Sequence, residues 1–128
     1  MEKPPIEMLV TLPLEDTMLK KIQQLSPRLN ISQFVTRKVE EIPADVLTQT
    51  EVLYTDLVIP SVTAAPNLRW IQFHWAGVEF LLDAPQALRT DLQFTTLSGA
   101  AAPQMADYIM MMLLALGHHL PDLYANQL

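Results

Sequence analysis

The tetrapeptide His74-Trp75-Ala76-Gly77 contains the residue types that most directly suggest a binding site. Ala76 and Gly77 are small and join an apolar run to a helical pattern, so a ligand can approach their backbone N–H groups. Unpaired N–H groups at the start of a helix favour an anion, because they donate hydrogen bonds and the helix dipole is positive there. The alternative is that Gly77 only permits a tight turn.

Side chains close to this turn could contribute to the same site. His74 could contact a ligand or donate a proton, although the sequence assigns it no partner and a hydrogen-bonded structural role is the alternative. Trp75 could line the site or fill the core. A second loop, residues 95–102, offers the hydroxyl groups of Thr96 and Ser98. These hydroxyls could equally satisfy nearby backbone groups.

Residue content argues against several other kinds of site. The chain has no cysteine, which excludes disulfides, thiol nucleophiles and thiolate metal ligands. Its glycines, Gly77, Gly99 and Gly117, are too far apart for a dinucleotide-binding or triphosphate-binding loop. His118 and His119 are adjacent and would point about 100° apart on a helix, which makes a poor pair of metal ligands. We therefore expect no metal-binding and no cofactor-binding residue in this chain.

Charge and hydropathy narrow the range of partners and locations. Eight Lys and Arg residues against fourteen Asp and Glu residues give a net charge of -6, which argues against nucleic acid. The uncharged segment 108–117 is too short to cross a bilayer, because a spanning helix needs about 20 apolar residues. The first residues lack the apolar core of a secretory signal. We expect a cytoplasmic protein that binds neither nucleic acid nor a membrane.

Short apolar runs alternate with helical patterns along the chain. We expect strands at 6–12, 31–39, 51–59, 70–75 and 92–97 and helices at 14–25 and 78–88, while 42–49 is ambiguous. A long helix begins at Pro103 and could run to the chain end. This alternation predicts one α/β domain over residues 1–128, a flavodoxin-like, doubly wound parallel sheet of about five strands in three layers. Ligands bind such sheets at the carboxyl ends of strands, where the 74–77 turn falls.

Two segments in succession resemble the D-isomer-specific 2-hydroxyacid dehydrogenase family. They are residues 67–82, Asn-Leu-Arg-Trp-Ile-Gln-Phe-His-Trp-Ala-Gly-Val-Glu-Phe-Leu-Leu, and 95–108, Thr-Thr-Leu-Ser-Gly-Ala-Ala-Ala-Pro-Gln-Met-Ala-Asp-Tyr, followed by an apolar helix. Three features differ from the usual family pattern. Trp75 replaces a small residue, Thr96 stands where Asn is frequent, and Glu79 and Asp107 exchange the usual Asp and Glu.

The resemblance implies the substrate-binding domain of an NAD- or NADP-dependent enzyme. In that family the N–H groups corresponding to Ala76 and Gly77 hold the carboxylate of a 2-oxo or 2-hydroxy acid. The family's cofactor loop and its catalytic arginine, acidic residue and histidine follow the long helix and have no counterpart in these 128 residues. We therefore expect weak acid binding, no catalytic residue, and no hydride transfer by this chain alone. The alternative is a free-standing, non-catalytic binding or dimerising domain.

The segment from Pro103 to Leu128 also predicts self-association. Its residues 108–117 are apolar around the whole helix, whereas a helix on one sheet needs a single apolar stripe. The resemblance places this helix between two domains, so its outer surface would have a partner. We expect a homodimer formed through residues 103–128. The alternative is that the sheet and loops of the same chain cover the helix on both sides.

Overall fold

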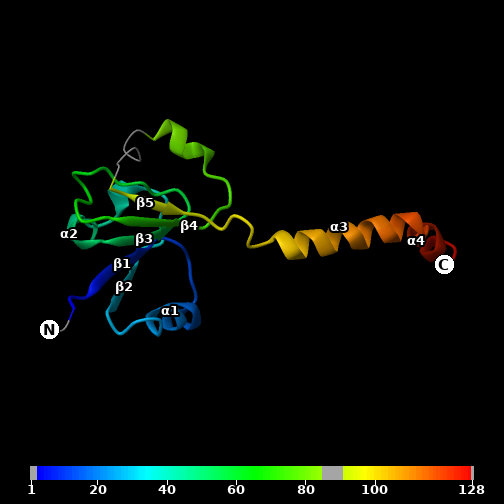
Figure 1. Ribbon diagram of the computed structural model, residues 1–128, viewed down its shortest axis with the longest axis horizontal. Coiled ribbons are helices and arrows are strands. Elements are labelled where there is room, and N and C mark those ends of the chain that lie inside the picture. Colours follow the sequence, from blue (N-terminus) through cyan, green and yellow to red (C-terminus); the bar gives the residue numbers. More distant parts are fainter. Residues whose placement is uncertain (1–2, 85–90, 128) are drawn as a thin grey trace. The chain divides into compact units, whose positions relative to one another are not determined.

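The computed structural model describes residues 3–84 and 91–127 (Figure 1). The chain divides into two compact units, Met1–Thr96 and Leu97–Leu128, and each is described by itself. No helix in the described part of the chain is both long and apolar enough to span a membrane.

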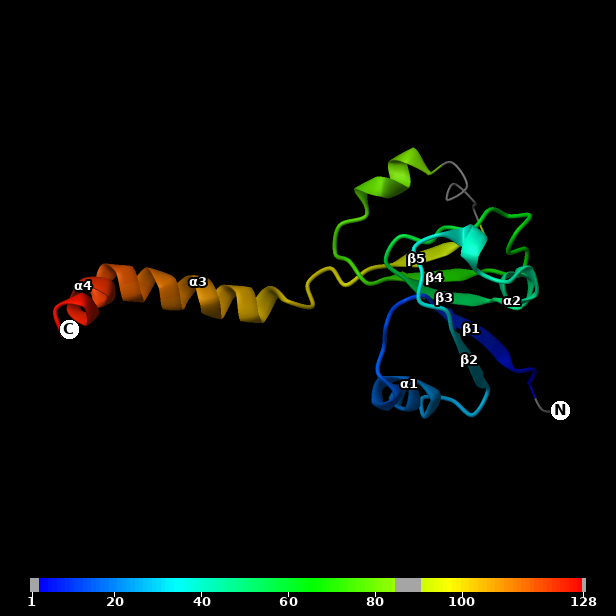
Figure 2. The same ribbon diagram turned by 180° about the vertical axis from the view of Figure 1, so that it is seen from behind.

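The first unit is built on a sheet of five parallel strands. The strands are β1 (Ile6–Val10), β2 (Leu29–Gln33), β3 (Val52–Thr55), β4 (Trp70–Phe73) and β5 (Gln93–Thr95). Their order is β2-β1-β3-β4-β5, and both views place β1 between β2 and β3 (Figures 1 and 2). The order changes direction beside β1, which is the doubly wound, flavodoxin-like α/β arrangement. The predicted fold class is confirmed.

Short helices and turns connect the strands. Among the described residues of the first unit these are α1 (Asp16–Gln23), α2 (Ala44–Gln49) and two 3₁₀ turns, η1 (Val39–Glu41) and η2 (Glu79–Asp83). The ambiguous segment 42–49 therefore contains a helix. The second unit contains α3 (Ala102–Gly117) and α4 (Leu120–Ala125).

The core lies on one face of the sheet, because alternate strand residues point to the same side. Leu9, Leu53, Ile71 and Phe73 occupy neighbouring positions on this face and are completely buried. The ring of Phe73 stacks on Phe94 of β5 with 5.9 Å between centroids. Residues from α2 and from the segments that precede α2, follow β3, follow η2 and precede β5 complete the cluster, which also contains Ile42, Leu47, Val58, Ile59, Ala65, Leu68, Ala84 and Leu92.

Two predicted helices differ from the structure. A helix was expected at 78–88, and residues 85–88 of that prediction lie outside the described residues. In the described part, the five-residue turn η2 takes the place of the helix. Ala84 is non-helical, with φ −115° and ψ 80°. It precedes Pro85, whose ring disfavours helical geometry in the residue before it.

The long helix that could have run from Pro103 to the chain end stops at Gly117. Pro121 lies in the first turn of α4 and has no N–H to donate to the carbonyl of Gly117, four residues earlier. Between α3 and α4, His119 adopts a left-handed conformation with φ 53° and is the N-cap of α4. The two helices α3 and α4 are therefore separate elements.

A buried hydrogen bond joins the chain just after β1 to the end of β3. Thr11 Oγ1 donates to Thr55 Oγ1 at 2.6 Å, and the backbone N–H of Val58 donates to the same oxygen at 3.0 Å. Thr11 and Thr55 are 2% and 0% exposed. One hydroxyl thus satisfies two buried donors and holds together the strand ends at which the sheet order reverses.

This arrangement predicts unequal effects of two isosteric substitutions. Thr55→Val leaves both Thr11 and the Val58 N–H without an acceptor and should lower the free energy of unfolding by about 2–6 kcal/mol, since each unpaired buried group costs about 1–3 kcal/mol. Thr11→Val removes only one donor and should cost about 1 kcal/mol. Urea denaturation followed by circular dichroism measures both. An equal or larger loss for Thr11→Val would contradict this account.

Candidate functional site

A pocket of about 480 Å³ opens at the carboxyl ends of the strands. Small-molecule sites in proteins commonly have volumes of about 300–1,000 Å³. Segments that follow β1, β2, β3 and β4 all contribute to it, which is where doubly wound sheets bind ligands. Its lining residues are Thr11, Leu12, Pro13, Leu14, Val35, Thr36, Arg37, Asp56, His74 and Trp75.

Arg37 and Asp56 form an ion pair in the wall of this pocket. Arg37 Nε donates to Asp56 Oδ2 at 2.9 Å, while the backbone N–H of Leu57 donates to Asp56 Oδ1 at 2.9 Å. The Asp56 side chain is 6% exposed and that of Arg37 is 69% exposed. A buried carboxylate without a counter-charge would be costly, so Arg37 compensates its charge and remains reachable from solvent.

His74 has a hydrogen-bond partner that the sequence did not reveal. Its Nδ1 lies 2.6 Å from the hydroxyl of Tyr54, and the two rings meet edge to face at 5.7 Å. Burial raises the pKa of Tyr54, so its hydroxyl stays protonated and able to donate. When Tyr54 donates to Nδ1 of the neutral ring, the imidazole proton is on Nε2. His74 is exposed and lines the pocket.

The predicted anion site at Ala76 and Gly77 lies in an exposed turn after β4. A side chain at position 77 would lie 2.7 Å from Glu79 Oε2, so the glycine accommodates a carboxylate from this chain. The element that follows is the five-residue turn η2, which carries far less dipole than the helix expected there. The dipole argument is therefore weakened, and the nearby carboxylate of Glu79 would repel an incoming anion.

The two tryptophans do not fill the core. Trp70 is 40% exposed because it projects from the face of the sheet opposite the core. Its Nε1 donates to Thr95 Oγ1 at 2.7 Å. Trp75 is 48% exposed because it lies beyond the last residue of β4, where it lines the pocket.

The other two predicted site residues fall on different sides of the boundary between the units. Thr96 directly follows β5 at the end of the first unit. Ser98 belongs to the second unit, next to Gly99, which has φ 83°. The participation of Thr96 and Ser98 in a site with Ala76 and Gly77 stays a prediction. The structure brings only His74 and Trp75, of the six predicted residues, into the lining of the pocket.

The adjacent histidines lie at the junction of α3 and α4. His119 Nδ1 is 3.3 Å from Asp122 Oδ2, an exposed pair one helical turn apart. Within residues 3–84 and 91–127, no group of three or more His, Asp or Glu side chains is placed to hold a metal ion.

Three important residues of the pocket were missed from the sequence, Thr11, Arg37 and Asp56, and so was Tyr54, the hydrogen-bond partner of His74. Thr11 and Asp56 each follow the last residue of a strand, which is a signal that could have been used. The pairing of Arg37 with Asp56 depends on the strand order, because Arg37 lies beyond β2 and Asp56 beyond β3. No sequence periodicity indicates that these two residues meet.

No protein-family model and no curated protein matches the chain. The likeness to the 2-hydroxyacid dehydrogenases therefore rests on the residues of segments 67–82 and 95–108 alone.

The Tyr54–His74 contact predicts that replacing Tyr54 changes the tautomer of the neutral imidazole. Tyr54→Phe removes the donor to Nδ1, so the neutral ring should shift from mainly Nε2–H to a mixture of both tautomers. Long-range ¹H–¹⁵N NMR spectra of the histidine side chains measure this ratio above the pKa of the ring. Tyr108→Phe, on α3, is the matched control. An unchanged His74 tautomer ratio in Tyr54→Phe would refute the assignment.

Proposed function

We propose that this domain binds the carboxylate of a small 2-oxo or 2-hydroxy acid, as the substrate-binding domain of an NAD- or NADP-dependent D-2-hydroxyacid dehydrogenase. The observation that carries the proposal is the pocket at the strand ends. Trp75 lines that pocket and directly precedes Ala76-Gly77, the two residues that the family resemblance assigns to carboxylate binding. The flavodoxin-like strand order is compatible with such a domain.

The chemistry of the site fits binding and orientation of the acid. The backbone N–H groups of Ala76 and Gly77 would donate to the carboxylate, and the Nε2–H of His74 would be available to the adjacent oxygen. In the family that the chain resembles, the reduced nicotinamide cofactor supplies the hydride, so the role proposed for these residues is to bind and orient the acid. Affinity should be weak, because the turn is exposed and a carboxylate there keeps much of its hydration.

Titration with pyruvate, glyoxylate and hydroxypyruvate, followed by amide NMR, tests the proposal. We expect the largest shifts at Ala76 and Gly77. Glu79→Gln should tighten binding about two- to fivefold, because it removes a nearby like charge worth a few tenths to one kcal/mol. Glu40→Gln, an exposed change away from this pocket, should leave the affinity unchanged. Shifts confined to other surfaces would rule out the site.

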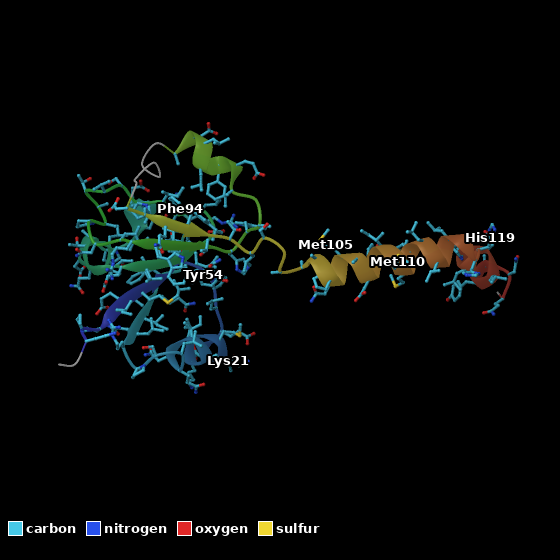
Figure 3. All side chains as sticks on the ribbon, viewed as in Figure 1. Lys21, Tyr54, Phe94, Met105, Met110 and His119 are labelled. Carbon is cyan, nitrogen blue, oxygen red and sulfur yellow. The ribbon has the colours of Figure 1, made fainter. Side chains whose placement is uncertain are left out.

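A second candidate function, dimerisation, is favoured by the surface of α3. None of its residues is buried, and Figure 3 shows Met105 and Met110 projecting from it. Successive residues on a helix lie about 100° apart, so Ile109, Met110, Met111 and Met112 together present apolar side chains in every direction. Their exposed fractions are 38–55%. An apolar helix of this kind requires a cover, and a second copy of the chain would supply one.

Light scattering at high protein concentration measures the self-association directly. We expect a mass of twice 14.5 kDa. Replacing both Met111 and Leu114 with Glu should split the dimer, because it places charges on the apolar surface of α3. Met18 and Leu25, exposed apolar residues in the first unit, provide the matched control when both are changed to Glu. A monodisperse monomer of the unaltered chain would exclude this function.

A further inference from the structure

The pocket at the strand ends has mainly apolar walls, although it lies at the solvent-accessible edge of the sheet. Leu12, Pro13 and Leu14 follow β1, Val35 follows β2, and Trp75 follows β4. Val35 is 61% exposed and Trp75 is 48% exposed. These side chains contact water in the free protein, and an apolar group in the pocket would remove that contact.

The charges in the pocket are already compensated. Arg37 and Asp56 are its charged lining residues, apart from the titratable His74, and they pair at 2.9 Å. A second anionic group on a ligand would compete with Asp56 for Arg37 and would approach a buried carboxylate. The lining therefore disfavours a dicarboxylic acid and favours an uncharged, apolar group.

From these two observations we infer that the pocket holds the bulky apolar side chain, preferably aromatic, of the 2-oxo acid whose carboxylate lies at Ala76 and Gly77. The inference rests on the proposed function, and it adds the class of substrate. Trp75 is the residue next to Ala76. The same segment would therefore bind the carboxylate and form one wall of the side-chain pocket. Trp75 provides a flat aromatic surface on which a ring can stack.

Phenylpyruvate, pyruvate and 2-oxoglutarate are the probes for this inference. Calorimetry or NMR titration of the full chain should give phenylpyruvate a dissociation constant roughly tenfold or more below those of the other two, the scale on which an apolar pocket discriminates. Phenylpyruvate should shift the Trp75 indole N–H and the methyl groups of Leu14 and Val35. Equal affinities with shifts at Ala76 and Gly77 would overturn the side-chain pocket and leave the proposed function standing.

A fourth ligand, 3-phenylpropanol, separates the two claims because it has the ring without the carboxylate. One outcome is that phenylpyruvate and 3-phenylpropanol shift Val35 and Trp75, while no acid shifts Ala76 or Gly77. That outcome would support an apolar pocket and overturn the proposed carboxylate site. No shift at Val35 or Trp75 with any probe would overturn the side-chain pocket.

Two pairs of variants test the wall residues with little risk to the fold, because all four positions are exposed. Val35→Glu places a charge in the apolar wall and should abolish the preference for phenylpyruvate. Val62→Glu makes the same change at a 48%-exposed residue outside the pocket and should preserve the preference. Trp75→Ala should reduce the preference for phenylpyruvate, and Trp70→Ala should not. Retention of the full preference in both Val35→Glu and Trp75→Ala would refute the inference.

Discussion

The hydrogen bond between Thr11 and Thr55 is the interaction on which the candidate site depends most. It connects the chain at the ends of β1 and β3, the strands beside which the sheet order reverses. Because Thr55 also accepts from the Val58 N–H, the same oxygen fixes the start of the loop that carries Asp56. Parallel pairing then aligns the end of β4, and with it His74 and Trp75, beside these residues.

The edge of the sheet at the carboxyl ends of the strands has two parts that differ in charge. In the pocket, Arg37 compensates the charge of the buried Asp56, which leaves mainly apolar walls facing the opening. At the turn, the side-chain carboxylate of Glu79 lies in the space that a side chain at position 77 would occupy. Apolar burial would therefore contribute more to ligand binding than charge attraction. This balance is consistent with the weak binding of an acid that we propose.

The sequence predicted the fold more completely than the site. Buried strands produce uncharged runs that periodicity detects, and the turn at Ala76 and Gly77 was placed correctly after β4. Contacts that depend on strand order, such as Arg37 with Asp56, leave no local signal. The end of α3 was not predicted, although Pro121 marks it. The prediction relied on the apolar pattern of the side chains, which does not reveal that proline lacks a backbone N–H donor.

The most direct measurement of the central claim is an isotope-filtered nuclear Overhauser spectrum of the labelled protein with unlabelled phenylpyruvate. The account predicts cross-peaks from the ligand ring to the indole of Trp75 and to the methyl groups of Leu14 and Val35. It also predicts cross-peaks from the ligand methylene protons to the amides of Ala76 or Gly77. Cross-peaks only to methyl groups of α3, or none to the residues that line the pocket, would contradict it.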